Sequence, residues 1–395
     1  MSSSSASAVP ASHSAAALSR ARWGTRAQFA ALGALAGTWG AHVPSVKLQY
    51  ALGEAMLSMV LLAAALGAVA SLFAAGRIVA WLGTRKTSVA AGLVLCAALG
   101  LVLVLPGLGV LLPLMLLFGA AMSLFDVAIN TEGSELEALS GRAIMSNLHG
   151  MFSVGGMVGA ALASAMLRAG MPPPLQLAIV CVVVAVFVIV ASRGMLDAHV
   201  AHAEGDGGNA HFAWPKGLLL VIGLLLFAGM TAEGVMYDWS VLYLKQDIGM
   251  PQSQAALGYA TFAAAMALAR FAGDSLRARY AERVLLCLGA ALAAVAMSVV
   301  LLSASAWVAL IGFALVGAGL APVAPILFNA ATRVPGVSRA AAIASVTSIG
   351  YSGFMVGPPL IGGIAQTTSL TAALGVVVVA AVLLAFGASY VPNKT

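Results

Sequence analysis

The feature that most constrains this sequence is a series of apolar stretches. Each is about 20 residues long, the length that an α-helix needs to cross a bilayer. Of the 395 residues, 62% are hydrophobic and only 8% are charged, too few charges to cover the surface of a water-soluble domain. The sequence therefore predicts an all-α membrane protein. Its net charge of +6 reflects Lys and Arg in loops, and no nucleic-acid partner is expected.

Twelve such stretches lie between Pro- and Gly-containing breaks, and the longest polar interval separates the first six from the last six. The predicted spans are residues 27–46, 54–75, 87–105, 108–130, 146–168, 174–193, 216–240, 254–273, 283–304, 307–330, 340–363 and 369–391. We therefore expect a six-helix bundle over 27–193, a cytoplasmic linker over 194–215 and a second six-helix bundle over 216–391.

Residues 1–26 are rich in Ser, Ala and Arg and contain no acidic residue. This composition is shared by mitochondrial transit peptides and by disordered tails of Ala-rich bacterial proteins. We interpret the segment as a disordered cytoplasmic tail.

The two halves of the sequence repeat each other. The matching glycines, at an offset of 197 or 198 residues, are Gly76 with Gly273, Gly155 with Gly353, and Gly159 with Gly357. A nearly constant offset indicates two parallel six-helix repeats, an arrangement in which two bundles of a transporter rock about a site between them.

The distribution of basic residues predicts the orientation. With both chain ends placed inside, only Lys47, Arg168 and Lys245 of the 19 Lys and Arg residues fall outside. Cytoplasmic loops carry the excess of Lys and Arg, so both termini are expected in the cytoplasm and the protein in the bacterial inner membrane.

The twelve spans, the repeat and the basic loop 76-GRIVAWLGTRK-86 resemble the major facilitator superfamily over residues 27–391. The resemblance implies a major facilitator fold, transport by alternating access and a monomer. The loop also departs from the family pattern, because the usual acidic residue in its middle falls at Ala80.

In the family, this loop and its counterpart in the second half latch the cytoplasmic side. The residues that the resemblance assigns to gating are Gly76, Arg77, Gly83, Arg85, Lys86, Arg270, Asp274 and Arg277. Asp274 is expected to replace the missing acid of the second half, paired with Arg270 one helical turn earlier. The alternative for Arg77, Arg85 and Lys86 is that they only set the topology.

Shorter motifs are similar to narrower branches. The segments 126-DVAIN-130 and 148-LHGMFSVG-155 resemble the fucose-permease branch. An uncharacterised bacterial inner-membrane branch is closer still, through Glu132-Gly133 and 232-AEGVMYDW-239.

Carboxylates inside apolar spans are costly and usually face a water-filled cavity or a partner. Asp126, Glu132 and Glu233 are therefore the candidates for proton coupling. Asp126 and Asn130 lie one turn apart on one helix face. The alternative is that Asp126 lies near the membrane interface and pairs with Arg142.

The candidates for substrate binding are polar or aromatic residues expected near mid-membrane: Trp39, His42, Asn130, His149, Glu233, Tyr237, Asp238, Asn329 and Tyr351. An aromatic ring can stack on a sugar ring, and His titrates near neutral pH. For Trp39 and His42 the alternative is an anchor or a packed polar group, and for Tyr237 it is interfacial anchoring.

The sequence thus predicts a secondary active transporter that moves a small polar, sugar-like solute with proton coupling. An efflux antiporter for drugs or metabolites is the alternative. No P-loop, GxSxG or His-rich metal cluster is present, so no enzyme, metal or cofactor is expected. The expected partners are the solute, the proton and the lipid bilayer. Cys96, Cys181 and Cys287 are expected to be packing residues.

Overall fold

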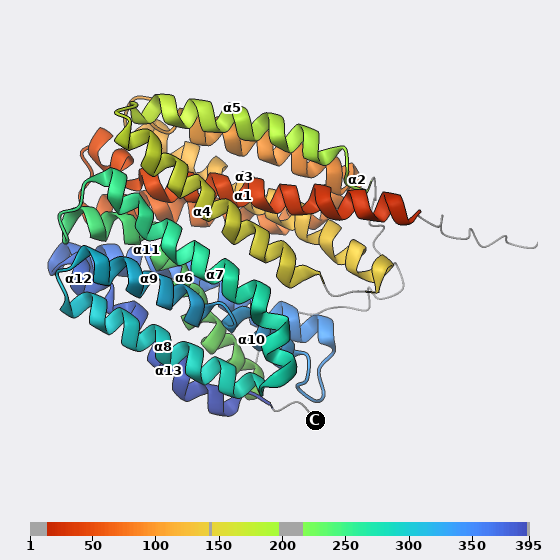
Figure 1. The fold of residues 1–395 in the computed structure, drawn as a ribbon. Coiled ribbons are helices and arrows are strands. Elements are labelled where there is room, and N and C mark those ends of the chain that lie inside the picture. The colour runs from red at the N-terminus through yellow and green to blue at the C-terminus, as the bar shows by residue number, and fades with distance from the viewer. Residues whose placement is uncertain (1–13, 142–143, 197–215, 393–395) are drawn as a thin grey trace, which may run out of the picture.

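The protein folds into a bundle of roughly parallel α-helices (Figure 1). The computed structural model describes residues 14–141, 144–196 and 216–392. Its elements are α1 (Ala15–Gln49), α2 (Glu54–Leu101), α3 (Leu108–Ser140), α4 (Met145–Arg168), α5 (Pro173–Ser192), α6 (Leu218–Gln246), α7 (Gln252–Arg279), α8 (Glu282–Leu302), α9 (Ala306–Leu320), α10 (Val323–Ala331), α11 (Arg339–Thr367), α12 (Leu370–Ala373), α13 (Gly375–Gly387) and the 3-10 turn η1 (Ala388–Tyr390).

These elements form twelve spans, as the sequence predicts. A continuous helix of 48 residues would be about 72 Å long, more than twice the hydrocarbon thickness of a bilayer. Helix α2 is therefore two spans, divided at Gly83, whose backbone is non-helical (φ 81°, ψ 160°). Helices α9 and α10 form one span interrupted at Pro322, which cannot donate a backbone hydrogen bond. The last span consists of α12, α13 and η1.

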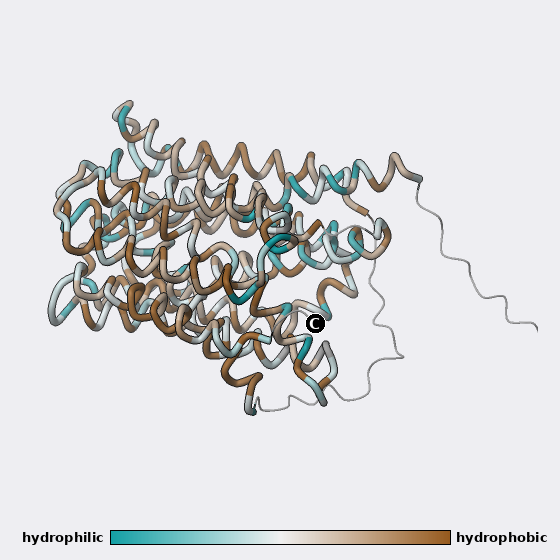
Figure 2. The backbone as a smooth tube through the Cα atoms, turned by 60° about the horizontal axis from the view of Figure 1, so that its bottom comes forward, coloured by the Kyte–Doolittle hydropathy of each residue, from teal (hydrophilic) through white to brown (hydrophobic). Residues whose placement is uncertain are grey.

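Ten of the twelve spans are strongly apolar, and α1 and α11 are less so. In the described part of the chain, nine segments are long and apolar enough to cross a membrane, with α2 counted once. Figure 2 shows hydrophobic stretches along the length of the helices. Leu302, Phe73 and Phe386 are among the many large apolar side chains on the outer surface, where lipid would cover them.

The first helix begins earlier than predicted. Helix α1 starts at Ala15, because the Ser14 hydroxyl caps it by accepting a hydrogen bond from the backbone N–H of Ala17 (3.2 Å). The expectation of disorder is therefore wrong for residues 15–26. Ala21 is fully buried beside Leu136 and Leu196, which ties this turn to the bundle. Residues 1–13 of the predicted tail and 197–215 of the predicted linker lie outside the described residues.

Because successive spans alternate in direction, the bundle has two ends. At one end α1 begins, α3 and α7 end, α4 and α8 begin, and the chain finishes; we call it the termini end. At the opposite end, the far end, α1 and α6 finish and α7 begins. In the first half α1 packs on α4 and α2 on α3, and in the second half α6 packs on α11. The halves meet through α4 with α7 and α2 with α11.

Glycines allow α1 and α4 to touch along their backbones. A Cβ on Gly33 would lie 1.9 Å from the carbonyl oxygen of Phe152, and one on Gly155 would lie 2.0 Å from that of Ala30. The equivalent pair in the second half repeats this, since a Cβ on Gly353 would lie 2.6 Å from the carbonyl oxygen of Phe227. Small residues take this role in membrane bundles because close packing replaces the hydrophobic effect between helices.

We predict that Gly155→Ala destabilises the protein and that Gly363→Ala does not. The added methyl group at Gly155 meets backbone that cannot move aside, at a cost of ~1–3 kcal/mol. Gly363 has open space around its Cβ position, so the same change there brings only the better helix propensity of Ala. Thermal unfolding of the purified variants measures both. Equal unfolding temperatures would contradict the packing argument.

Candidate functional site

A large cavity with two lobes lies between the two halves of the bundle. One lobe, of about 780 Å³, contains the paired residues Glu233 and Arg270, and we call it the polar lobe. The other, of about 610 Å³, is lined by Trp39 and Tyr259 among other rings, and we call it the aromatic lobe. Residues that line both lobes are Asp126, Asn130, Phe152, Tyr351 and Phe354. The polar lobe continues to the termini end, where Glu137, Met145 and Gly273 line it.

Asp126 and Asn130 of α3 stand where the lobes meet. The side-chain amide of Asn130 donates to Asp126 Oδ1 and to the backbone carbonyl oxygen of Asp126, both at 2.9 Å. The predicted pairing on one helix face is therefore present. Among the described residues, no Lys, Arg or His forms an ion pair with Asp126, so a neutral amide is its hydrogen-bond donor. The predicted alternative partner, Arg142, lies outside the described residues.

An ion pair crosses the polar lobe. Arg270 of α7 donates from Nη2 to Glu233 Oε1 of α6 at 3.0 Å, and both side chains are largely buried. Arg270 also donates from Nη1 to Ser153 Oγ of α4 at 3.0 Å, which links the two halves. Arg270 is thus a cavity residue held by Glu233. Its predicted pairing with Asp274 is not described, because the Asp274 side chain lies outside the described residues.

Aromatic rings and one further carboxylate complete the site. Tyr237 packs between Tyr259 and Phe262, with ring centroids 5.1 and 5.2 Å away. Asp238, the next residue on α6, lines the aromatic lobe. His149 lines the polar lobe and meets the ring of Phe29 edge to face at 5.3 Å. Within the described chain, no three His, Cys, Asp or Glu side chains gather as metal ligands.

Most of the predicted substrate-binding residues meet at this cavity: Trp39, Asn130, His149, Glu233, Tyr237, Asp238 and Tyr351. Sequence reasoning missed Tyr259, Phe152, Phe354 and Ser153. The signal for Tyr259 was available, since a Tyr near the start of an apolar span is a candidate of the same kind as Tyr351. Ser153 gave no such signal, because serine is common in membrane helices as a packing residue.

His42 does not reach the cavity. It is fully buried, and its Nδ1 lies 3.3 Å from Ser45 Oγ, which in turn accepts a hydrogen bond from Gln252 Nε2 at 2.6 Å. Gln252 is the first residue of α7, so these contacts tie the two halves together near the far end. In this structure His42 lines neither lobe and matches the predicted alternative of a packed polar group.

Glu132 also lies outside both lobes, and its side chain has no exposed surface. Its two oxygens accept hydrogen bonds from Thr84 Oγ1 (2.6 Å) and from the backbone N–H of Leu196 (2.5 Å). Thr84 directly follows the break in α2. The prediction that Glu132 faces the cavity is wrong, because α3 turns this residue towards α2 and the end of the sixth span.

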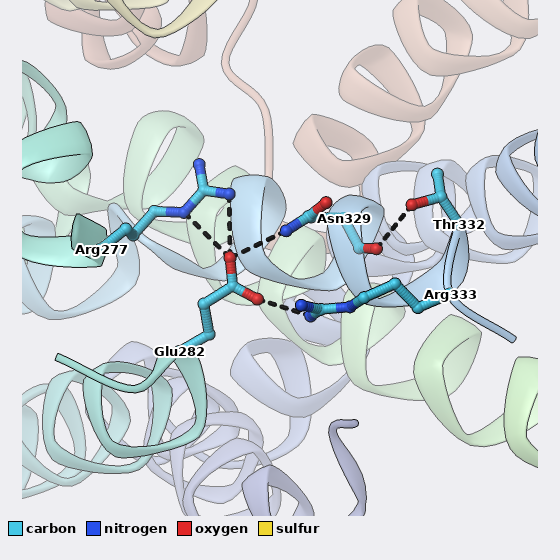
Figure 3. A network of polar contacts seen from close by, with 5 residues as sticks. All are labelled: Arg277, Glu282, Asn329, Thr332 and Arg333. Atoms are coloured by element: carbon cyan, nitrogen blue, oxygen red, sulfur yellow. Dashed lines mark hydrogen bonds and ion pairs between the residues drawn. The ribbon is translucent and has the colours of Figure 1, made fainter. Parts of the chain in front are cut away.

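Asn329 belongs to a separate network at the termini end (Figure 3). Glu282 receives a hydrogen bond from Asn329 Nδ2 (2.8 Å) and pairs with Arg277 (2.9 Å) and Arg333 (2.5 Å). The predicted substrate residue Asn329 is thus a partner of Glu282. Arg277, predicted to gate, holds the end of α7 to the start of α8.

The predicted gating loop of the first half, residues 76–86, contains the break between the second and third spans. Gly83 is where the chain passes between the second and third spans, and its positive φ explains why glycine stands there. Gly76, Arg77 and Lys86 are exposed, and Arg85 is half-buried. Within the described residues, the side chains of Arg77, Arg85 and Lys86 make no hydrogen bond or ion pair. Their gating role stays a prediction.

A cavity held between two helical halves of a multi-pass bundle is the architecture of a secondary transporter. The family model of the Major Facilitator Superfamily matches residues 219–395. An uncharacterised MFS-type transporter of Yersinia pestis is 37% identical over 89% of this chain and 91% of its own length. The membrane protein MosC of Rhizobium meliloti is 30% identical over 91% of this chain and 87% of its own.

The chain therefore belongs to the major facilitator superfamily, and it is a multi-pass transporter and not an enzyme. Two solved structures share its fold at 13% identity. A mutant of the nucleoside transporter NupG aligns with a TM-score of 0.71 over 94% of this chain and 99% of that one. A bacterial homologue of the lysosomal transporter Spinster aligns with a TM-score of 0.69 over 96% and 98%.

The Glu233–Arg270 pair should show energetic coupling. We predict that Glu233→Gln lowers stability by ~3–5 kcal/mol, because it leaves the largely buried guanidinium without a counter-charge. The double variant Glu233→Gln/Arg270→Met should lose less than the sum of the two single changes. A double-mutant cycle from thermal unfolding tests this. Additive losses would show that the pair is not coupled.

We also predict that Glu132→Gln reduces stability by ~1–3 kcal/mol and leaves transport intact. One of the two oxygens that accept hydrogen bonds becomes an amide nitrogen, which cannot accept. Unfolding temperature and transport rate are measured on the same preparation. Loss of transport at an unchanged unfolding temperature would restore a coupling role for Glu132.

Proposed function

We propose that the protein is a proton-coupled transporter of a small polar, sugar-like solute, with Asp126 as the coupling residue. The position of Asp126 carries the proposal. It is a carboxylate in the middle of a helical span, it lines both lobes, and its hydrogen-bond donor is the neutral Asn130. Uptake or release of a proton by Asp126 therefore changes the charge by one unit where the two lobes meet. A bound solute would contact both halves of the protein at this place.

The other acidic residue of the polar lobe is suited to a different task. Glu233 is neutralised by Arg270 and cannot change charge without leaving that cation unpaired. We assign the pair to orienting the solute and to linking α6, α7 and α4 through Ser153. Asn130, His149 and the Glu233–Arg270 pair offer hydrogen bonds to hydroxyl groups.

The size and lining of the cavity support a solute of this kind. Lobes of about 780 and 610 Å³ fall in the range of small-molecule sites. The indole of Trp39 and the ring of Tyr351 face the cavity and can stack on the apolar face of a sugar ring. These features agree with the resemblance to the fucose-permease branch.

We further propose that the structure is the inward-facing state, with both chain ends in the cytoplasm. The far end is closed by contacts between the halves. Gln252 Nε2 donates to the carbonyl oxygen of Ala41 (3.2 Å), and α11 packs so closely on α2 that a Cβ on Gly362 would lie 2.3 Å from Ser58. The polar lobe reaches the termini end. The Spinster homologue is described as inward-facing and unoccupied.

We predict that Asp126→Asn abolishes proton-driven transport and retains exchange. The amide is nearly isosteric with the carboxylate but cannot take up and release a proton. Proteoliposomes with an imposed proton gradient, tested with a pooled panel of sugars and organic acids, measure uptake and exchange. Loss of gradient-driven accumulation should be about tenfold or more, set by the size of the gradient.

Glu132→Gln is the matched control, because it removes a carboxylate from the same helix outside the cavity. Equal gradient-driven uptake by wild type and Asp126→Asn would refute coupling at Asp126. No uptake together with extrusion of dyes or drugs would favour the efflux antiporter.

A further inference from the structure

The charges that line the aromatic lobe are not balanced. Its described lining residues include two acids, Asp126 and Asp238, and no Lys, Arg or His. The polar lobe differs, because two arginines line it: Arg270, which pairs with Glu233, and Arg277, which pairs with Glu282. Removing a carboxylate from water without a counter-charge costs several kcal/mol. A positively charged group in the aromatic lobe would therefore offset this cost.

Of the described carboxylates that line the cavity, Asp238 is the one with neither a hydrogen-bond donor nor a counter-charge for its side chain. Glu233, Glu282 and Glu54 each form an ion pair with Arg or Lys. Within residues 14–141, 144–196 and 216–392, no hydrogen bond or ion pair engages Asp238. It stands five residues beyond Glu233 on α6, ~7.5 Å nearer the far end. It therefore lies deeper in the cavity than the ion pair when entry is from the termini end.

Aromatic rings line the same lobe as this carboxylate. Three ring pairs contribute to the lobe: Trp39 with Phe118 (centroids 5.3 Å apart), Tyr237 with Tyr259 (5.1 Å) and Tyr351 with Phe354 (6.2 Å). The face of an aromatic ring carries negative electrostatic potential and binds ammonium groups. The described lining includes only two carboxylates, Asp126 and Asp238, and no three His, Cys, Asp or Glu side chains of the described residues gather as metal ligands, which disfavours a Ca²⁺ or Mg²⁺ ion.

We infer that the solute is an organic cation, whose ammonium group binds Asp238 in the aromatic lobe. This inference rests on the proposed transport function and narrows its substrate class to polar molecules that carry an amine. The ammonium group faces Asp238, the body of the molecule packs on the rings, and its hydroxyl groups reach Asn130 and the polar lobe. The ionised form of Asp126 adds a second negative charge at the boundary of the lobes.

The test is equilibrium binding to the purified full-length protein in lipid nanodiscs, with no ion gradient. The probes are two matched pairs, cyclohexylamine against cyclohexanol and glucosamine against glucose. We expect the amines to bind in calorimetry and to raise the unfolding temperature, and the matched alcohols to do neither. Alcohols that bind as well as their amines, or amines that do not bind at all, would overturn the inference.

Variants of Asp238 test where the ammonium group binds. Asp238→Asn should weaken amine binding by at least ~30-fold, because it removes the partner of a desolvated cation. Asp238→Glu should retain part of the affinity. Asp247→Asn is the control, since Asp247 ends the same helix α6 outside the cavity and accepts hydrogen bonds from Thr371. Unchanged amine binding by Asp238→Asn would overturn the assignment of the ammonium group to Asp238.

Failure of this inference is distinguishable from failure of the proposed function. Amine binding that depends on Asp238, without proton-driven uptake in proteoliposomes, would refute coupling and keep the cation site. Proton-driven uptake of neutral sugars by a protein that binds no amine would refute the cation site and keep the coupling. The unfolding temperature of each unliganded variant shows whether it has folded.

Discussion

A carboxylate or guanidinium that leaves water for the interior of an apolar bundle loses several kcal/mol of hydration unless other charges or hydrogen bonds replace it. The arrangement of this protein follows from that requirement. At the termini end, Glu282 accepts hydrogen bonds from three side chains. Glu132 accepts hydrogen bonds from a hydroxyl group and from a backbone N–H. Glu233 takes Arg270. Among the described residues, Asp126 has only the neutral amide of Asn130 as a donor and Asp238 has no hydrogen-bond or ion-pair partner, and these two carboxylates line the aromatic lobe.

Each repeat contains a carboxylate that accepts hydrogen bonds at the termini end. The helix that carries this carboxylate differs between the repeats. In the first half, Glu132 near the end of α3 accepts from Thr84, which begins the third span. In the second half, Glu282 begins the ninth span and accepts from Asn329 near the end of α10. The offsets between these positions, 197 and 198 residues, are those of the glycine pairs. The fold thus preserves a polar contact at the termini end of each half, although the residues that make it have exchanged places.

Several elements could be predicted because they depend on local properties. The spans follow from length and apolarity, and the close packing at Gly155 and Gly353 follows from the repeat of small residues. The pair of Asp126 and Asn130 follows from the helical period alone. The start of α1 could not be predicted in this way. Its extra turns are held by burial of Ala21 against Leu136 and Leu196, which lie more than 100 residues away in the sequence.

By itself, the sequence determined that this is a helical membrane protein of twelve spans in two repeats, because hydrophobic length and periodicity act residue by residue along the chain. It also named most of the polar residues that meet in the cavity. Only the tertiary structure decided which of them do so. The rotation of α3 against α2 buries Glu132, and the contact of α1 with α7 encloses His42. The packing of α6 on α7 gives Glu233 a cation, whereas no described Lys, Arg or His pairs with Asp238, since a side chain's partners depend on the neighbouring helix.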